Sequence, residues 1–386
     1  MEAVERRRST PMKHQPNFEN LRRTLLREGP PGPVPFFEIG VEPGVMGAVL
    51  GEKFPLDLHI FRPPSPLPPG EEGTRAAVRT LDLFVKFSVE MGYDYVFMFV
   101  PFNLPRHVGQ TVDSAAPPGW SDGFRYWENE VKGPIQSWED FEKYPWPDPE
   151  QLLVGQLDYL NLVVPEGMKI SANMLGVFEQ ACFLMGFQTL AYALYDQPDL
   201  VDAVFAKIGD LCAAAARHAA SLDNVGIILQ SDDMGSNIGT LIKPEMLRER
   251  VLPYHKRMAS IAHEAGKLFV FHSCGNVTAI MDDLIDDVGI DAKHSYQDAV
   301  LPVEKVCERW GDRISVMGGI DMDLLSRSTE EQVRKRVRQV LDACGAKGTG
   351  YCLGSGNSIA EYIPVKNYLA MLDEGRRWNQ ENFGAK

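Results

Sequence analysis

Short apolar runs of strand length recur eight times along this chain of 386 residues, and most of them precede a stretch with helical character. The runs cover residues 34–40, 94–100, 167–173, 225–233, 267–271, 291–296, 313–321 and 349–353. The second run is apolar almost throughout, which is typical of a parallel strand covered on both faces. Eight strands alternating with helices predict an α/β fold, a single (β/α)8 or TIM barrel.

A doubly wound open sheet is the alternative fold. No early strand is followed by the Gly-x-Gly-x-x-Gly pattern of dinucleotide-binding folds, and Gly354-Ser-Gly356 lacks the spacing of the third glycine, so the barrel is favoured. We expect residues 1–30 to form an N-terminal extension and 31–386 to form the barrel. The excursions 41–75 and 101–150 follow the first two strands and are expected as insertions over the barrel mouth.

Composition excludes several classes of function. The net charge of −14 argues against a nucleic-acid partner and against an anionic membrane. No apolar run is long enough to span a bilayer, and the charged N-terminus does not resemble a signal peptide. The six cysteines lack the spacing of a disulfide scaffold, which predicts a reducing cytoplasm. Four of them are interpreted as packing residues: Cys182, Cys212, Cys307 and Cys344.

Polar side chains gather where the predicted strands end, which is the catalytic end of such barrels. These positions are Glu38, Asn173, Gln230, Asp232, Asp233, His272, Cys274, Tyr296, Asp298, Asp321 and Cys352. His272 and Cys274 are two residues apart, so they point to the same face of their strand. We expect the barrel to bring Cys352, at the end of the eighth strand, to the same mouth.

An imidazole and two thiolates are zinc ligands, and three protein ligands leave a fourth position open, as in catalytic zinc sites. The sequence therefore predicts a zinc ion held by His272, Cys274 and Cys352. The alternative is two buried core cysteines and a histidine with ordinary hydrogen bonds. Asp298 is a further candidate ligand for the time when no substrate is bound, although such a residue commonly caps a helix.

The remaining polar residues at the strand ends are candidates for substrate contacts and proton transfer. Asp232 and Asp233 are the candidate catalytic residues, and one of the two is expected to be a structural hydrogen-bond acceptor. Polar groups of a substrate are expected to bind Glu38, Asn173, Gln230 and Tyr296. For Glu38, Asn173 and Tyr296 a structural interpretation is at least equally good. His294, inside the sixth strand, is expected to face the helices.

The stretch 101–150 is rich in aromatic residues, which argues against disorder. Trp120 and Trp127 belong to it, and they are candidates for an apolar wall around a flat substrate ring. The alternative is that these aromatic residues pack a lid on the barrel.

The pattern His272-x-Cys274 with Cys352 far downstream resembles the zinc motif of corrinoid-linked methyltransferases in the uroporphyrinogen decarboxylase superfamily. Further stretches are similar to that superfamily: 176–181, 184–186, 231–236, 243–246 and 318–321. The resemblance runs from about residue 30 to the C-terminus. It implies a TIM barrel, a zinc ion that binds and activates a methyl-group partner, and a separate corrinoid protein that docks over the barrel mouth.

The chain departs from true uroporphyrinogen decarboxylases after the first strand. Those enzymes carry an arginine-rich segment there that binds substrate carboxylates, whereas residues 40–51 contain no arginine. A highly anionic tetrapyrrole would find little positive charge there, so decarboxylation is not expected.

Two directions of methyl transfer follow from the resemblance. We favour transfer from a small O-methyl donor, such as a methoxylated aromatic, to the cob(I)alamin of a corrinoid protein. The alternative is transfer from a methyl-corrinoid to a thiol of the coenzyme M or homocysteine type. Zinc suits both as a Lewis acid. A zinc-stabilised binding barrel without turnover is a third interpretation, and a homodimer is left open.

Overall fold

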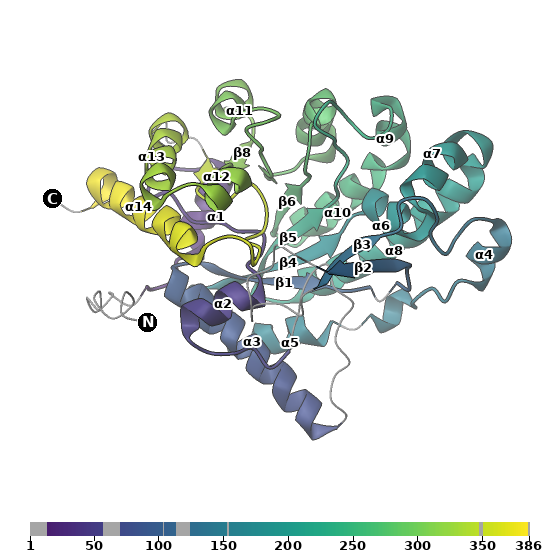
Figure 1. Ribbon diagram of the computed structural model, residues 1–386, viewed down its shortest axis with the longest axis horizontal. Helices are drawn as coiled ribbons and strands as arrows, with labels where there is room; N and C mark the ends of the chain where they lie inside the picture. Colours follow the sequence, from purple (N-terminus) through teal and green to yellow (C-terminus); the bar gives the residue numbers. More distant parts are fainter. Residues whose placement is uncertain are drawn as a thin grey trace.

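The computed structural model describes residues 14–56, 70–102, 104–112, 124–152, 154–346 and 350–384. A curled sheet of seven parallel strands forms its centre, in the order β1-β4-β5-β6-β7-β8-β9 (Figure 1). The strands are β1 (Tyr95–Val100), β4 (Lys169–Leu175), β5 (Val225–Ser231), β6 (Leu268–His272), β7 (Ala292–His294), β8 (Ser315–Met317) and β9 (Tyr351–Cys352). This α/β fold is TIM-barrel-like.

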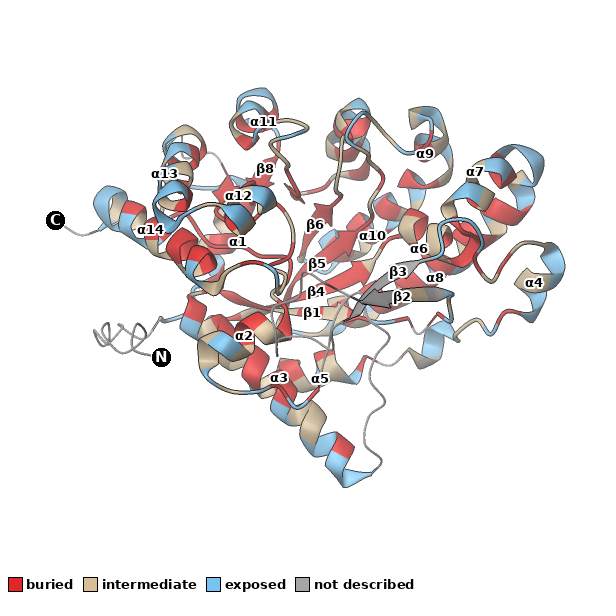
Figure 2. Cartoon of the chain, viewed as in Figure 1, coloured by how far each residue is buried: buried red, intermediate tan, exposed pale blue. Residues whose placement is uncertain are grey.

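Helices pack around this sheet. They include α1 (Phe18–Leu26), α2 (Pro43–Leu50), α3 (Glu71–Met91), α4 (Trp138–Lys143), α5 (Gly155–Val163), α6 (Val177–Met185), α7 (Phe187–Asp196), α8 (Pro198–Ser221), α9 (Pro244–Arg250), α10 (Leu252–Glu264), α11 (Val303–Trp310), α12 (Met322–Arg327), α13 (Glu330–Val340) and α14 (Val365–Phe383). Shorter helical turns are η1 (Pro149–Gln151), η2 (Thr278–Ile280), η3 (Asp283–Val288) and η4 (Leu341–Gly345). Figure 2 shows that the strands are buried, while the helices expose their outer faces.

The expected first strand, 34–40, is not part of the seven-stranded sheet. It reaches β9 through a parallel bridge, in which the N–H of Leu353 donates to the carbonyl of Pro35 (2.9 Å). On its other side, the N–H of Glu38 donates to the hydroxyl of Tyr95 in β1 (2.7 Å), and not to a backbone carbonyl. Proline has no N–H, and a side chain replaces the ladder toward β1, so the expected first strand is only an extended segment.

Two helical stretches are each divided in two. The first breaks between α6 and α7 at Gly186, which has a φ of +80°. A Cβ on this glycine would lie 2.6 Å from the backbone of Val131 and Lys132, so close packing and a left-handed backbone both require glycine here. The second breaks at Val251, between α9 and α10.

The excursion 101–150 contains a hairpin of β2 (Val108–Val112) and β3 (Phe124–Glu128), followed by α4 and η1. Its later part lies against the helices that follow β4, because the N–H of Ile135 donates to the carbonyl of Leu184 (2.9 Å). The excursion 41–75 contains α2 and the start of α3. That both excursions cover a barrel mouth stays a prediction.

The N-terminal helix α1 packs beneath β8 and β9, at the amino end of the sheet. Its Leu21 and Leu25 are fully buried. The hydroxyl of Ser315, the first residue of β8, donates to the carbonyl of Leu25 (2.7 Å). Part of the expected extension 1–30 is thus integrated into the core.

Cys307 of α11 and Cys344 of η4 form a disulfide, with their Cα atoms 5.9 Å apart. The interpretation of these two residues as mere packing residues is therefore wrong, because two buried helical segments bring their sulfurs together. Of the helices in the described ranges, not one is sufficiently long and apolar to span a membrane.

Candidate metal centre

Asp233, His272 and Cys274 bring their side chains together at the carboxyl ends of β5 and β6. His272 is the last residue of β6 and pairs in register with Ser231, so the residues that follow both strands meet at the same edge. The Nε2 atom of His272 lies 3.5 Å from Cys274 Sγ and 3.5 Å from Asp233 Oδ1. All three ligand atoms lie within 4.8 Å of one another.

These distances fit a tetrahedral zinc site. Zinc bonds of about 2.0–2.3 Å to N, O and S place neighbouring ligand atoms about 3.3–3.8 Å apart. Both measured distances from His272 Nε2 fall within this range. The side chain of Asp233 is 37% exposed, whereas that of His272 is nearly buried. An ion bound here would therefore be shielded from solvent on the side of His272 and open to solvent on the side of Asp233.

The carboxylate of Asp233 is ionised in this arrangement. Burial alone would raise the pKa of Asp233, but the hydrogen bond and positive charge that His272 supplies in its protonated form, together with the N–H of Cys274, outweigh burial and lower it. Burial and the charge of Asp233 raise the pKa of the Cys274 thiol. The sequence suggested Asp233 for proton transfer, whereas an ionised carboxylate beside an imidazole and a thiol suits metal binding.

Cys352, the third expected ligand, is not part of this group. It is a fully buried residue of β9, and burial and the charge of Asp94 raise the pKa of its thiol. The extended chain continues past β9, because Ser355 still forms a parallel bridge with Ile320. Cys352 pairs in register with Met317 of β8, and its sulfur is not among the ligand atoms that meet at Asp233, His272 and Cys274.

Asn357, which the sequence analysis did not single out, reaches the cluster instead. Its Nδ2 amide donates a hydrogen bond of 3.2 Å to Cys274 Sγ, and the hydroxyl of Ser295 lies 3.8 Å from the same sulfur. Both residues follow strands, Ser295 directly after β7 and Asn357 after the Gly-Ser-Gly turn beyond β9. A polar residue just past that turn was the only available signal for Asn357.

His294 faces the cluster and not the helices, contrary to expectation. It pairs with His272 in the register of β6 and β7, so both side chains point to the same face of the sheet. Their Nδ1 atoms are 2.8 Å apart, and the Nε2 of His294 lies 3.0 Å from the carbonyl oxygen of Ser355. His294 is fully buried, and burial together with the neighbouring His272 holds its pKa well below the usual range.

Glu38 lies behind this histidine pair. Its carboxyl group accepts the backbone N–H of Ser355 (2.9 Å) and contacts the hydroxyl of the same residue. Burial raises the pKa of Glu38 to about 8, although the hydrogen bonds from Ser355 oppose the shift. Glu38 is thus a buried support of the 355–357 turn, and its expected contact with substrate stays a prediction.

Asp232 has a structural position. It is fully buried, and its carboxylate accepts the N–H groups of Phe178 (3.1 Å) and Glu179 (2.7 Å) at the start of α6. The Nε2 of His255 lies 2.8 Å from the same carboxylate. A Cβ at Gly176 would lie 2.1 Å from Asp232 Cγ, so the carboxylate is enclosed on that side too. Of the paired aspartates, Asp232 is the structural acceptor.

Two other expected residues do not converge on the cluster. Gln230 pairs with Phe271, whose ring packs on His255 of α10, so Gln230 lies on the helix-facing side of the sheet. Asp298 accepts hydrogen bonds from Arg336 (3.0 and 3.3 Å).

Asn173 and Tyr296 are buried, and each keeps a polar atom without a hydrogen-bond partner among the described residues: Asn173 Nδ2 and Tyr296 Oη. The Oδ1 atom of Asn173 accepts from Ser231 Oγ (3.0 Å), and the Nζ of Lys293 lies 4.6 Å from the ring centre of Tyr296. Trp120 lies outside the described residues, and Trp127 is described only by its backbone in β3.

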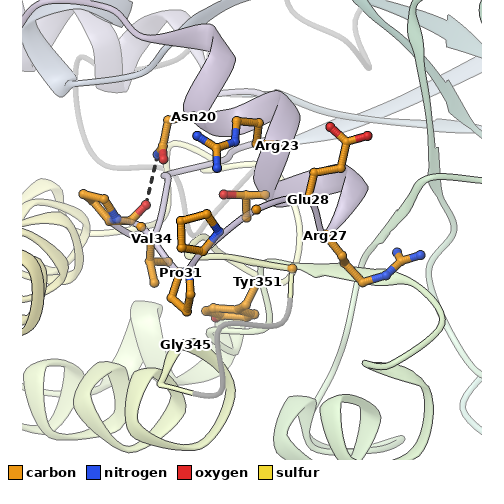
Figure 3. A pocket seen from close by; sticks show the side chains of 14 residues that line it. Asn20, Arg23, Arg27, Glu28, Pro31, Val34, Gly345 and Tyr351 are labelled. Carbon is orange, nitrogen blue, oxygen red and sulfur yellow. Dashed lines mark hydrogen bonds between the residues drawn. The ribbon is translucent and has the colours of Figure 1, made fainter.

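A pocket of about 250 Å³ lies far from this cluster (Figure 3). Its walls include Arg23, Pro31 and Tyr351, and Gly350 at the amino end of β9. His272 is at the carboxyl end of β6, and parallel strands begin and end on opposite sides of a sheet, so the pocket and the cluster are at opposite ends. The chemistry of the donor atoms makes the cluster the better candidate for a functional site.

Comparison with known proteins supplies a family. The family model described as uroporphyrinogen decarboxylase (URO-D) matches residues 127–378, which is more than half of the chain. No curated protein sequence matches.

Two solved structures share the fold. A methyltransferase from Methanosarcina mazei superposes with a TM-score of 0.66 at 17% identity, covering 93% of this chain and 98% of its own. A Listeria monocytogenes protein, provisionally described as a vitamin-B12-independent methionine synthase, gives a TM-score of 0.51 at 14% identity, with 92% and 100% covered. At these identities the likeness is one of fold alone.

Proposed function

Since the chain belongs to the uroporphyrinogen decarboxylase family, we propose that it is a zinc-dependent methyltransferase of that superfamily. It takes a methyl group from an O-methyl donor, a methoxylated aromatic compound, and transfers it to the cob(I)alamin of a separate corrinoid protein. The observation that carries this proposal is the meeting of Asp233, His272 and Cys274 at the carboxyl ends of two neighbouring strands.

Decarboxylation of a tetrapyrrole is disfavoured by the segment after Gly40. This segment forms α2 (Pro43–Leu50), and residues 40–51 carry one acidic residue, Glu42, and no arginine. Binding several carboxylates there would need cationic side chains. The family assignment alone does not decide the reaction, because one fold hosts many chemistries.

The reaction needs stabilisation of the leaving oxygen. When the methyl carbon passes from oxygen to the acceptor, the electron pair of the C–O bond remains on that oxygen, which later takes a proton from water. Zinc bound at this site would supply a Lewis acid for the ether oxygen. Asp232 and Asp233 do not supply the proton, since Asp233 is ionised and Asp232 acts as an acceptor for α6.

The surroundings of the sulfur favour an ether over a thiol as the partner of the metal. The described group has one thiol where the sequence suggested two, and the amide of Asn357 donates to that sulfur. A hydrogen bond to a thiolate draws negative charge away from the metal, which leaves the metal a stronger Lewis acid. This supports polarisation of an ether oxygen.

A donor screen with a reduced corrinoid protein tests the proposal. The spectral change from cob(I)alamin to methyl-cob(III)alamin should appear with at least one methoxylated aromatic donor and should disappear in Cys274→Ala. If no donor methylates the corrinoid while free thiols rapidly demethylate methylcobalamin, the enzyme acts in the thiol direction and the proposal is wrong.

A further inference from the structure

A buried row of polar groups leads from Glu38 through Ser355 and His294 to His272. We propose that His294 is a positioning residue, which holds His272 in the tautomer with hydrogen on Nδ1 and so leaves the Nε2 lone pair for a metal ion. The inference rests on the proposed function only for the identity of the metal-dependent reaction. Its basis is the set of donors and acceptors in this row.

The carbonyl oxygen of Ser355 determines which nitrogen of His294 carries the hydrogen. Its Nε2 lies 3.0 Å from the carbonyl oxygen of Ser355, and a carbonyl oxygen can only accept, so Nε2 carries a hydrogen. The ring is fully buried beside a second imidazole, which favours its neutral form. A neutral imidazole with hydrogen on Nε2 has a lone pair on Nδ1.

His294 in turn determines which nitrogen of His272 carries the hydrogen. Its Nδ1 lies 2.8 Å from the Nδ1 of His294, which is an acceptor, so the Nδ1 of His272 must donate. Its Nε2 then has a lone pair when the ring is neutral, and this atom is the one that lies 3.5 Å from both Cys274 and Asp233. A hydrogen bond at one ring nitrogen that leaves the other free is the usual support of a metal-binding histidine.

The carbonyl oxygen of Ser355, which accepts from His294, is held in place by the surroundings of its own residue. The hydroxyl of Ser355 contacts both a carboxyl oxygen of Glu38 and the carbonyl oxygen of Asn357. The backbone N–H of Ser355 also donates to the carboxyl group of Glu38 (2.9 Å), so Glu38 holds the residue whose carbonyl oxygen contacts His294.

The turn of residues 355–357 therefore supports two members of the cluster. The carbonyl of Ser355 orients His272 through His294, and the side chain of Asn357 donates to Cys274. One buried turn, fixed by Glu38, thus acts on both the nitrogen and the sulfur ligand.

The test compares two substitutions in the metal-free protein. His294→Leu removes the acceptor, whereas His294→Asn keeps an oxygen near the position of Nδ1. Nitrogen-15 NMR of the histidine rings, at a pH at which His272 is neutral, should show hydrogen on Nδ1 of His272 in the parent and in His294→Asn. In His294→Leu the signal should move toward the Nε2–H tautomer.

Zinc affinity, measured by competition with a chelator, should fall by about 10- to 100-fold in His294→Leu and by much less in His294→Asn. A purely structural role would lower the thermal stability of both variants and leave the tautomer unchanged, which would overturn the proposal. If His294→Leu does not fold, the NMR spectrum of the parent protein still tests the proposal. Hydrogen on Nε2 of neutral His272 in the parent would contradict it. Absence of methyl transfer alongside the expected tautomers would refute the proposed function and leave this inference intact.

Discussion

The carboxylate of Asp233 accepts a hydrogen bond of 2.8 Å from the backbone N–H of Cys274. This bond connects the end of β5 with the end of β6 and directs a carboxylate oxygen and a sulfur to the same space. It also distinguishes Asp233 from its neighbour Asp232, whose carboxylate is directed to the start of α6. Two adjacent aspartates thus have different functions, because successive side chains at the end of a strand point in opposite directions.

The first prediction concerns the third ligand. Asp233→Asn should lower zinc affinity by at least about tenfold, since a neutral amide is a poorer ligand than a carboxylate. Cys352→Ala should keep one zinc per chain, because its sulfur lies outside the cluster. Metal analysis after dialysis against a weak chelator measures both. Loss of zinc from Cys352→Ala with retention in Asp233→Asn would restore the ligand set that the sequence suggested.

A second prediction concerns stability against pH. The pKa of Glu38 is raised from 4.5 to about 8 by burial, so between these values the folded chain keeps a proton that the unfolded chain has lost. The free energy of unfolding should therefore fall as the pH rises through this range, by up to about 1.4 kcal/mol per pH unit from this group. Below pH 4.5 both states are protonated and the contribution is complete.

Glu38→Gln is the control for this effect, because it keeps an uncharged side chain of the same shape. Urea unfolding at intervals between pH 5 and 8 should give a flatter profile for the variant. Equal slopes in the two proteins would show that Glu38 is ionised in the folded chain.

The third prediction concerns the glycine before α6. Gly176→Ala should destabilise the fold by about 1–3 kcal/mol, because the new methyl group would displace the Asp232 carboxylate from its two N–H donors. Gly155→Ala, at the start of α5, has no atom within 4 Å of the new Cβ and should be neutral or slightly stabilising. Denaturant unfolding compares the two. A Gly176→Ala protein as stable as the parent would contradict the enclosed position of Asp232.

A fourth prediction separates Asp298 from the metal. Asp298→Asn should leave zinc content and zinc affinity unchanged, since its carboxylate accepts hydrogen bonds from Arg336. It should lower stability by about 1 kcal/mol or less, because Arg336 retains Glu304 and the pair is only partly buried. Isothermal titration with zinc is the measurement, and a weakened affinity would mean that Asp298 approaches the ion in the bound state.

Much of the fold follows from sequence periodicity. The apolar runs expected at 94–100 and 225–233 contain β1 and β5. The segment 34–40 does not form a regular strand, and the periodicity of its residues cannot show why. Its partner on one side is the hydroxyl of Tyr95, a tertiary contact 57 residues away.

The sequence was sufficient to predict which site residues lie at the strand ends. It did not predict the contacts made by the turns beyond them. The two-residue spacing of His272 and Cys274 is sufficient to place both on one face. The position of the Cys352 sulfur depends on how β8 and β9 pair, which the spacing of Cys352 along the sequence does not determine. The position of Asn357 depends on the following turn, and the partner of His272 depends on the register of β6 and β7.

The contact between the segment after Pro33 and the last helix has a consequence for the order in which the chain can fold during its synthesis. Val34 exchanges two hydrogen bonds of 2.8 Å with the side chain of Asn379 in α14, and its neighbour Phe36 pairs with Leu353. Val34 is therefore completed by a residue that is added 345 positions later. A growing chain that has reached β8 has neither β9 nor Asn357, so its sheet has an open edge and its sulfur ligand lacks the amide donor until residue 357 has been added.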